Sequence, residues 1–179
     1  MQTYIAILRG INVSGQKMIK MDDLKKHLEE LLFKNVRTYI QSGNIIFDHE
    51  NTGHADLAKL IEVKIEQKYG FQVPVIVLNN SRIETVLNKN SFINLRNENI
   101  DKLYVTFLSE NPQQEKLDKL TIPGNIKDEF VISGDVIYLF CPDGYGNTKL
   151  NNNFFEQKLK VTATTRNWKT VIKLSEMSH

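Results

Sequence analysis

The sequence predicts an α+β protein that consists of two copies of one folding unit. The segment 42–47, Ser-Gly-Asn-Ile-Ile-Phe, returns 91 residues later at 133–138 as Ser-Gly-Asp-Val-Ile-Tyr. The apolar segment 4–8 returns at 104–108, an offset of 100. Both halves show the order strand, helix, strand, strand, helix, strand, helix. A βαββαβ unit is the ferredoxin-like, split βαβ arrangement, so we predict a tandem duplication of two such units with a C-terminal helix.

Each element of the first half follows from its own pattern. Residues 3–9 are apolar on both faces, as in a central strand. Leu24 and Leu28 recur at helical spacing behind Asp22 and Asp23, whose charges suit the start of a helix. The remaining expected elements are strands at 36–41 and 45–48, a helix at 57–65, a strand at 73–78, and a short helix at 83–87 capped by Ser81.

The second half repeats this order from a strand at 102–108. Asn111 is the expected cap of the next helix, with Pro112 at its first position. The remaining expected elements are a hairpin between Val131 and Val136, a helix at 154–159, a strand at 161–163, and a last helix that carries Trp168. Ser81-Arg82 aligns with Thr165-Arg166, an offset of 84. The predicted domains are residues 1–90 and 102–179, joined by a polar linker at 91–101.

The repeat offset falls from 100 to 91, which places nine extra residues between the first and third strands of the first half. They lie in a long loop at 10–20, and extra loop length on a rigid strand is where functional residues concentrate. A purely structural Ω-type loop, pinned by Asn12 and Ser14, is the alternative.

Split βαβ topology brings the exit of the first strand and the tip of the hairpin to one edge of the sheet. Glycines there let backbone N–H groups turn toward an anion, and a guanidinium binds phosphate or carboxylate with two hydrogen bonds. The predicted ligand-binding residues at this edge are Arg9, Gly10, Asn12, Ser14, Gly15, Lys17, Gln41, Ser42 and Asn44. The alternative is that Gly43-Asn44, like Gly134-Asp135, is simply a two-residue turn.

A third cluster lies at 164–168. Thr165 is the expected cap of the last helix, which leaves Arg166 and Asn167 in the first turn, where free N–H groups favour an anion. We include these three residues and Lys149 among the ligand-binding candidates. A capped helix with Trp168 in the core is the alternative.

Other chemistry has little support. Cys141 is the only cysteine, which excludes an internal disulfide, fits a reducing cytoplasm and predicts a buried, unreactive thiol. The histidines lack metal-ligand spacing, and Gly10-x-x-x-x-Gly15 lacks the lysine that follows the last glycine of a P-loop, so we predict neither metal nor cofactor. No apolar run approaches the roughly 20 residues of a membrane span, and Arg9 interrupts the apolar start, so we expect no membrane segment or secretory leader.

Three segments are familiar together: 8–13 (Leu-Arg-Gly-Ile-Asn-Val), 39–44 (Tyr-Ile-Gln-Ser-Gly-Asn) and 164–168 (Thr-Thr-Arg-Asn-Trp). They closely resemble the hallmark motifs of the bacterial family catalogued as domain of unknown function 1697. Lys149-Leu150 also resembles the family pattern. The resemblance implies a bacterial cytosolic protein with a two-part α+β fold, and it implies no activity.

The leading functional hypothesis is a binding protein for a small ligand that carries phosphate or carboxylate. The second is an enzyme that acts on such a metabolite, for which the sequence offers no catalytic residue. The third is a nucleic-acid-associated protein, because residues 146–179 carry six basic and two acidic side chains. We disfavour the third, because residues 44–47 do not match the strand signature of RNA-recognition modules. The sequence indicates no oligomeric state.

Overall fold

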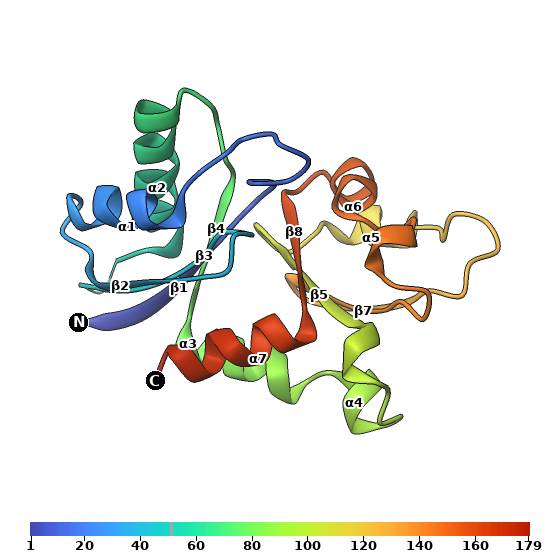
Figure 1. The fold of residues 1–179 in the computed structure, drawn as a ribbon. Helices are drawn as coiled ribbons and strands as arrows, with labels where there is room; N and C mark the ends of the chain where they lie inside the picture. Colours follow the sequence, from blue (N-terminus) through green and yellow to red (C-terminus); the bar gives the residue numbers. More distant parts are fainter. Residues whose placement is uncertain (51) are drawn as a thin grey trace. The chain divides into compact units, whose positions relative to one another are not determined.

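The computed structural model describes residues 1–50 and 52–179. It contains two four-stranded antiparallel sheets flanked by helices (Figure 1). The chain divides into two compact units, the first formed by Met1–Glu84 with Lys173–His179 and the second by Thr85–Ile172. The predicted mixed α+β class is therefore confirmed, with one antiparallel sheet in each of two similar units.

The first unit has its four strands in the order β2-β3-β1-β4, all antiparallel to their neighbours. Its elements are β1 (Gln2–Leu8), α1 (Met21–Glu29), β2 (Lys34–Tyr39), β3 (Asn44–His49), α2 (His54–Tyr69), β4 (Val75–Asn79) and the start of α3 (Asn80–Asn88). Alternate residues of β1, such as Tyr4 and Ala6, pack with Leu24 of α1 and Ile61 of α2 in one buried cluster. Both helices thus cover one face of the sheet (Figure 1).

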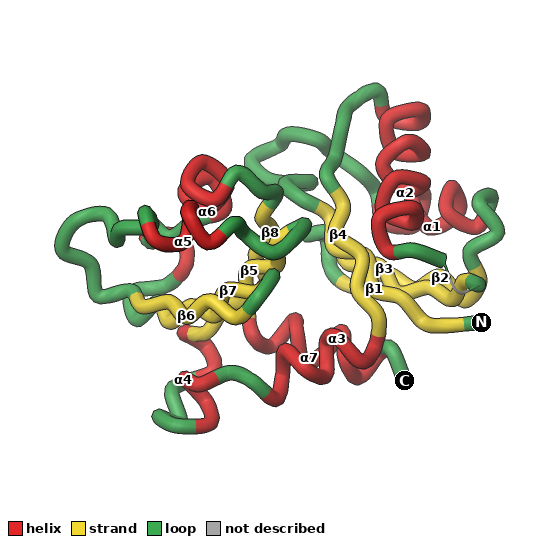
Figure 2. The backbone as a smooth tube through the Cα atoms, turned by 180° about the vertical axis from the view of Figure 1, so that it is seen from behind, coloured by secondary structure: helices red, strands yellow, loops and turns green. Residues whose placement is uncertain are grey.

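The second unit repeats the strand order as β6-β7-β5-β8. Its elements are the end of α3, α4 (Ser91–Asn94), a 3-10 turn η1 (Ile100–Lys102), β5 (Leu103–Leu108), α5 (Gln114–Asp118), β6 (Glu129–Ser133), β7 (Val136–Phe140), a 3-10 turn η2 (Tyr145–Asn147), α6 (Asn152–Leu159), β8 (Ala163–Asn167) and the start of α7 (Trp168–Met177). The residues of the predicted linker, 91–101, thus contain a short helix and most of a 3-10 turn. The backbone path can be followed in Figure 2.

The last strand of the second unit lies later in the chain than predicted. The expected strand was 161–163, but β8 runs from Ala163 to Asn167 beside β5. The hydroxyl groups of Thr106 and Thr165 lie 2.7 Å apart across this pair of strands, which satisfies polar side chains on a buried face. The expected start of α5 was also wrong, because the helix begins at Gln114 rather than directly after Asn111.

The helix caps expected at Ser81 and Thr165 are wrong as well, because asparagines at the strand ends take this role. Asn79 Oδ1 accepts a hydrogen bond from the Arg82 amide at 2.9 Å, and Asn167 Oδ1 accepts one from the Thr170 amide at 2.8 Å. Asn79 is paired with Tyr4, and Asn167 with Tyr104. The last strands of the two units, β4 and β8, therefore align at an offset of 88 residues, whereas the sequence repeat predicted an offset of 84.

The two hairpins differ in their turns. In the second unit Ser133 pairs with Val136, so Gly134-Asp135 is a two-residue turn. In the first, Tyr39 pairs with Asn44, so the turn holds residues 40–43 and the two-residue interpretation of Gly43-Asn44 is wrong. Asn44 begins β3 with no exposed surface, and its Nδ2 donates to the Tyr39 carbonyl at 3.0 Å.

Gly43 brings this turn into close contact with the end of β1 and the loop that follows. Its φ is +81°, and a Cβ there would lie 2.7 Å from Ile11 Cδ1 and 2.8 Å from Leu8 Cβ. The Leu8 amide donates to the Gly43 carbonyl at 2.9 Å. Only glycine allows this approach without displacing the loop.

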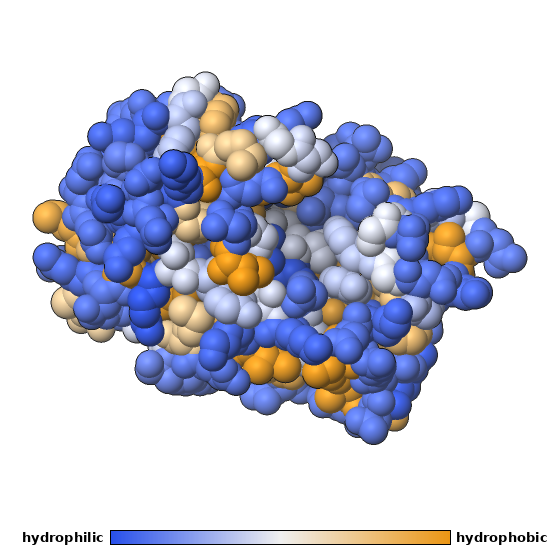
Figure 3. All heavy atoms as spheres, in the orientation of Figure 1, coloured by the Kyte–Doolittle hydropathy of each residue, from blue (hydrophilic) through white to orange (hydrophobic). Residues whose placement is uncertain are grey.

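The surface on the side shown in Figure 3 is mostly hydrophilic, with small separate apolar patches. Among the helices of the described residues, none is long and apolar enough to cross a membrane.

Cys141 has no exposed surface, and burial raises the pKa of its thiol to about 12, with the charge of Asp128 adding to the shift.

Replacing Gly43 with Ala is expected to destabilise the protein by about 3 kcal/mol, because overpacking adds to the strain of a left-handed backbone. Gly15→Ala is the matched control, since Gly15 has φ +73° but no atom within 4 Å of an added Cβ, and about 1 kcal/mol is expected. Urea denaturation measures both. Equal losses for the two variants would contradict the close contact at Gly43.

Cys141 is expected to react slowly with a thiol reagent in the native protein and stoichiometrically after denaturation, because the thiolate is scarce and buried. Spectrophotometric thiol titration measures the rate. A Lys119→Cys variant supplies an exposed thiol as the control, since the Lys119 side chain is 71% exposed. Rapid native labelling of Cys141 would disprove the assignment.

Candidate functional site

The most distinctive part of the first unit is the β1–α1 loop, residues 9–20. This connection has twelve residues, whereas the matching connection of the second unit, 109–113, has five. The loop starts with a hydrogen bond from the Arg9 amide to the Pro74 carbonyl at 2.9 Å. It then folds into a small hairpin, in which the Gln16 amide donates to the Val13 carbonyl at 2.9 Å and the Asn12 amide to the Lys17 carbonyl at 3.2 Å.

The loop backbone is held in left-handed conformations at five positions. The φ values are +69° at Gly10, +54° at Asn12, +50° at Ser14, +73° at Gly15 and +46° at Lys17. Three of these residues are not glycine, and such conformations cost energy that the surrounding structure must supply. Because backbone strain of this kind clusters at functional sites, these conformations mark the loop as a candidate functional segment.

Asn12 fixes the loop through its side chain. Its Nδ2 donates to the Ile19 carbonyl at 2.9 Å and to the Gln41 carbonyl at 2.8 Å, while its Oδ1 accepts from the Ile19 amide at 2.8 Å. The two hydrogen bonds with Ile19 close the base of the loop, and the bond to Gln41 joins the loop to the β2–β3 turn. Lys17 adds another link, because its Nζ donates to the Gln72 carbonyl at 2.6 Å.

Beside this loop lies an open groove of about 710 Å³, which we call the loop groove. It is lined by residues of the loop, the first turns of α1, the β2–β3 turn and the end of α2. They are Asn12, Met18, Ile19, Lys20, Met21, Asp22, Asp23, Lys26, Gln41 and Tyr69. The volume is typical of a small-molecule site.

Charges of both signs line the loop groove near the start of α1. Lys20 is the N-cap of this helix and provides no side-chain cap, while Asp22 and Asp23 occupy the first turn. Lys26 Nζ lies 3.9 Å from Asp23 Oδ1, with both side chains well exposed. Free N–H groups and the helix dipole favour negative charge at this end.

Tyr69 closes one side of the loop groove with a hydroxyl that lacks a partner. Its Oη is buried and makes no hydrogen bond within the described part of the chain. Burial raises the pKa of the hydroxyl, and the charge of Asp23 adds to the shift. The ring contacts His27 edge-on, with centroids 5.9 Å apart. A buried polar atom without a partner is costly, so a bound group that supplied one would be favoured.

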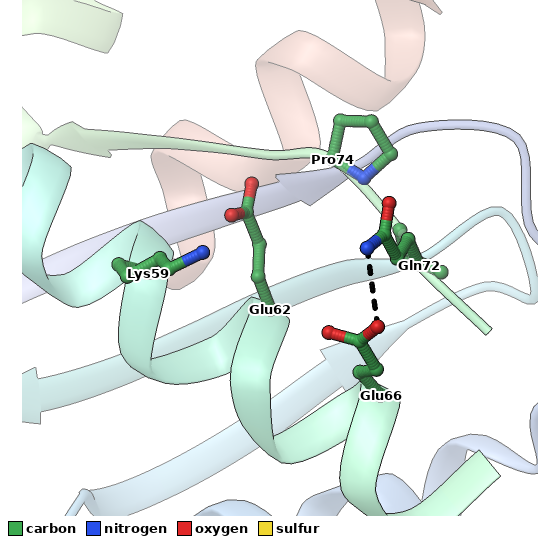
Figure 4. Close-up of a pocket in the computed structure, with 6 residues that line it drawn as sticks. Lys59, Glu62, Glu66, Gln72 and Pro74 are labelled. Atoms are coloured by element: carbon green, nitrogen blue, oxygen red, sulfur yellow. Dashed lines mark hydrogen bonds between the residues drawn. The ribbon is translucent and has the colours of Figure 1, made fainter. Parts of the chain in front are cut away.

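A second, smaller pocket of about 150 Å³ lies along α2 and the start of β4 (Figure 4). Its carboxylates support the fold: Glu66 Oε1 accepts from Gln72 Nε2 at 3.1 Å, and Glu62 Oε1 accepts from the Val75 amide at 3.0 Å. These bonds fix the segment that also receives Lys17, and thus the position of the loop.

The predicted ligand residues of the first unit have different positions. Asn12 and Gln41 line the loop groove. Ser14, Gly15 and Lys17 are exposed on the loop hairpin. The partly buried residues Arg9, Gly10 and Ser42 flank the junction of loop and turn, while the buried Asn44 closes the turn and its Nδ2 also contacts Ser42 Oγ at 3.1 Å.

The predicted ligand residues of the second unit lie on its last strand and a loop. Thr165 belongs to β8, where its hydroxyl donates to Asn152 Oδ1 at 2.7 Å and accepts from Tyr145 Oη at 3.0 Å. Arg166 is on β8 as well and is only 7% exposed; its Nη1 donates to the Thr165 carbonyl at 2.9 Å. The prediction that Arg166 lies in the first turn of the last helix is therefore wrong. Asn167 caps α7, and Lys149 is exposed.

Most residues of the groove lining were not predicted from the sequence. Lys20 and Lys26 follow the long loop and were recognisable as basic residues near a helix start. Met18 was recognisable as an apolar residue inside an otherwise polar loop. Tyr69 comes from the far end of α2, and no local pattern indicated that it would approach Asp23.

A conserved bacterial protein from Streptococcus pneumoniae has a similar solved structure, with a TM-score of 0.73 and 23% sequence identity over 99% of each chain. At this identity the likeness establishes the fold. No curated protein matched the chain. The family model described as a protein of unknown function, DUF1697, matches residues 1–138. Since this match spans well over half of the sequence, the chain belongs to the DUF1697 family.

Proposed function

We propose that the protein binds a small ligand with a phosphate or carboxylate group in the loop groove. The observation that carries the proposal is the buried Tyr69 hydroxyl, which lacks a hydrogen-bond partner among the described residues while its side chain lines a groove of about 710 Å³. A ligand group that reached this hydroxyl would supply the missing partner and recover part of the desolvation cost.

The anionic group is the part of the ligand that the start of α1 recognises. Lys20 and Lys26 supply positive charge, and the first turn of α1 adds backbone N–H groups that no side chain caps. Asn12 acts as a positioning residue, because its amide is engaged with the loop and the turn. Gln41 offers an exposed amide to the ligand. The proposal rests on the first unit alone.

We also propose a more detailed description of the fold, based on the order of its strands and helices. The strand orders β2-β3-β1-β4 and β6-β7-β5-β8, each with a helix after the first and third strands, support two ferredoxin-like split βαβ units that arose by duplication. The lone cysteine supports a cytoplasmic location, because disulfides are rare there.

Lys20→Met and Lys26→Met are each expected to weaken anion binding about tenfold or more, because each removes a charge-assisted contact worth roughly 1.5–3 kcal/mol. Calorimetry with inorganic phosphate, nucleoside monophosphates and 3-phenylpropionate measures the affinity. Lys25→Met is the matched control: Lys25 is on the same helix, does not line the groove and pairs with Glu29 at 3.9 Å.

Binding of one of these anions to the wild type, unchanged in Lys25→Met and lost in the other two variants, supports the proposal. Equal affinities in all three variants contradict it, and so does the absence of binding by every anion.

A further inference from the structure

We infer that the loop groove selects a zwitterion, namely an α-amino acid with an apolar side chain. This inference rests on the proposed function and narrows the class of ligand. The starting observation is the charge balance of the lining, in which Lys20 and Lys26 are matched by Asp22 and Asp23.

A simple anion satisfies only half of this lining. Two carboxylates on the same groove repel a phosphate or a lone carboxylate, and they offset the attraction of the two lysines. A ligand that carries an ammonium group as well as a carboxylate interacts favourably with both signs. The charge pattern therefore favours a zwitterion over an anion.

The charged side chains of the groove are available for such a ligand. Asp22 and Lys20 make no side-chain ion pair or hydrogen bond with the residues that the structure describes. The Asp23–Lys26 pair is long at 3.9 Å and well exposed, so it contributes little and is easily exchanged for ligand contacts. The ammonium group is assigned to Asp22 and Asp23, and the carboxylate to Lys20 and Lys26.

Apolar atoms complete the lining and specify the rest of the ligand. Met18 is 62% exposed, although an apolar side chain gains by burial, and Met21 and Tyr69 also line the groove. Methionine adapts to irregular shapes and makes favourable contacts with aromatic rings. An apolar or aromatic side chain on the amino acid would cover these atoms.

L-Phenylalanine and its two half-charged analogues test the inference. 3-Phenylpropionate lacks the ammonium group, and 2-phenylethylamine lacks the carboxylate. Calorimetry of the full chain is expected to give L-phenylalanine an affinity at least tenfold above that of either analogue.

Two variants test which side chains interact with the ammonium group and the carboxylate of the ligand. Asp22→Asn is expected to weaken L-phenylalanine about tenfold while leaving 3-phenylpropionate unchanged or improved, because it removes an attraction for the first and a repulsion for the second. Lys20→Met is expected to weaken both. Asp118→Asn, an exposed aspartate of α5 in the second unit, is the control and should change neither. Thermal melting establishes that each variant is folded.

The outcomes separate the two proposals. Equal affinities of L-phenylalanine and 3-phenylpropionate, both reduced by Lys20→Met, would support anion binding and overturn the preference for a zwitterion. Preferential binding of L-phenylalanine that Asp22→Asn does not alter would overturn the assigned role of Asp22. No binding by any of the three compounds would overturn the inference, while the proposed function would still be decided by inorganic phosphate and the nucleoside monophosphates.

Discussion

The organisation of the candidate site depends on one side chain, the amide of Asn12. Its three hydrogen bonds join the start of the β1–α1 loop to its end at Ile19 and to the β2–β3 turn at Gln41. Four members of the groove lining, Asn12, Ile19, Lys20 and Gln41, therefore have their positions set by this residue or by its immediate partners. Asparagine suits the position, because it tolerates the left-handed backbone observed there and offers two donors and an acceptor.

A comparison of the two units explains why the groove belongs to the first. In the first, Ala6 and Val77 face each other on β1 and β4 in an apolar core, and the polar groups lie in the long loop. In the second, the equivalent pair is Thr106 and Thr165, and a network of hydroxyl and amide groups satisfies them. Its short connection, 109–113, forms no comparable hairpin. One architecture thus carries its polar groups in two different places, and in the first unit they lie around the open loop groove.

The sequence predicted the order of elements because strand and helix periodicities are local and strong. It misplaced β8, because the strand pattern was sought in apolar residues, whereas Thr164, Thr165 and Arg166 continue the ladder through backbone pairing that polar side chains do not reveal. The two-residue turn suggested by Gly43-Asn44 was also wrong, because the turn is set by the pairing of Tyr39 with Asn44 and by the contact of Gly43 with Ile11. The long loop could be found from the offsets, but the approach of Tyr69 to Asp23 is a tertiary effect that no spacing encodes.

The central claim is that the Asn12 amide holds the loop in the shape that forms the groove. Hydrogen exchange at the Ile19 amide, which donates to Asn12 Oδ1 at 2.8 Å, measures this most directly. In an Asn12→Gly variant, which keeps the left-handed backbone accessible, the account predicts fast exchange at Ile19 with unchanged protection of β1, for example at Ile5. Undiminished protection of Ile19 in this variant would contradict the account.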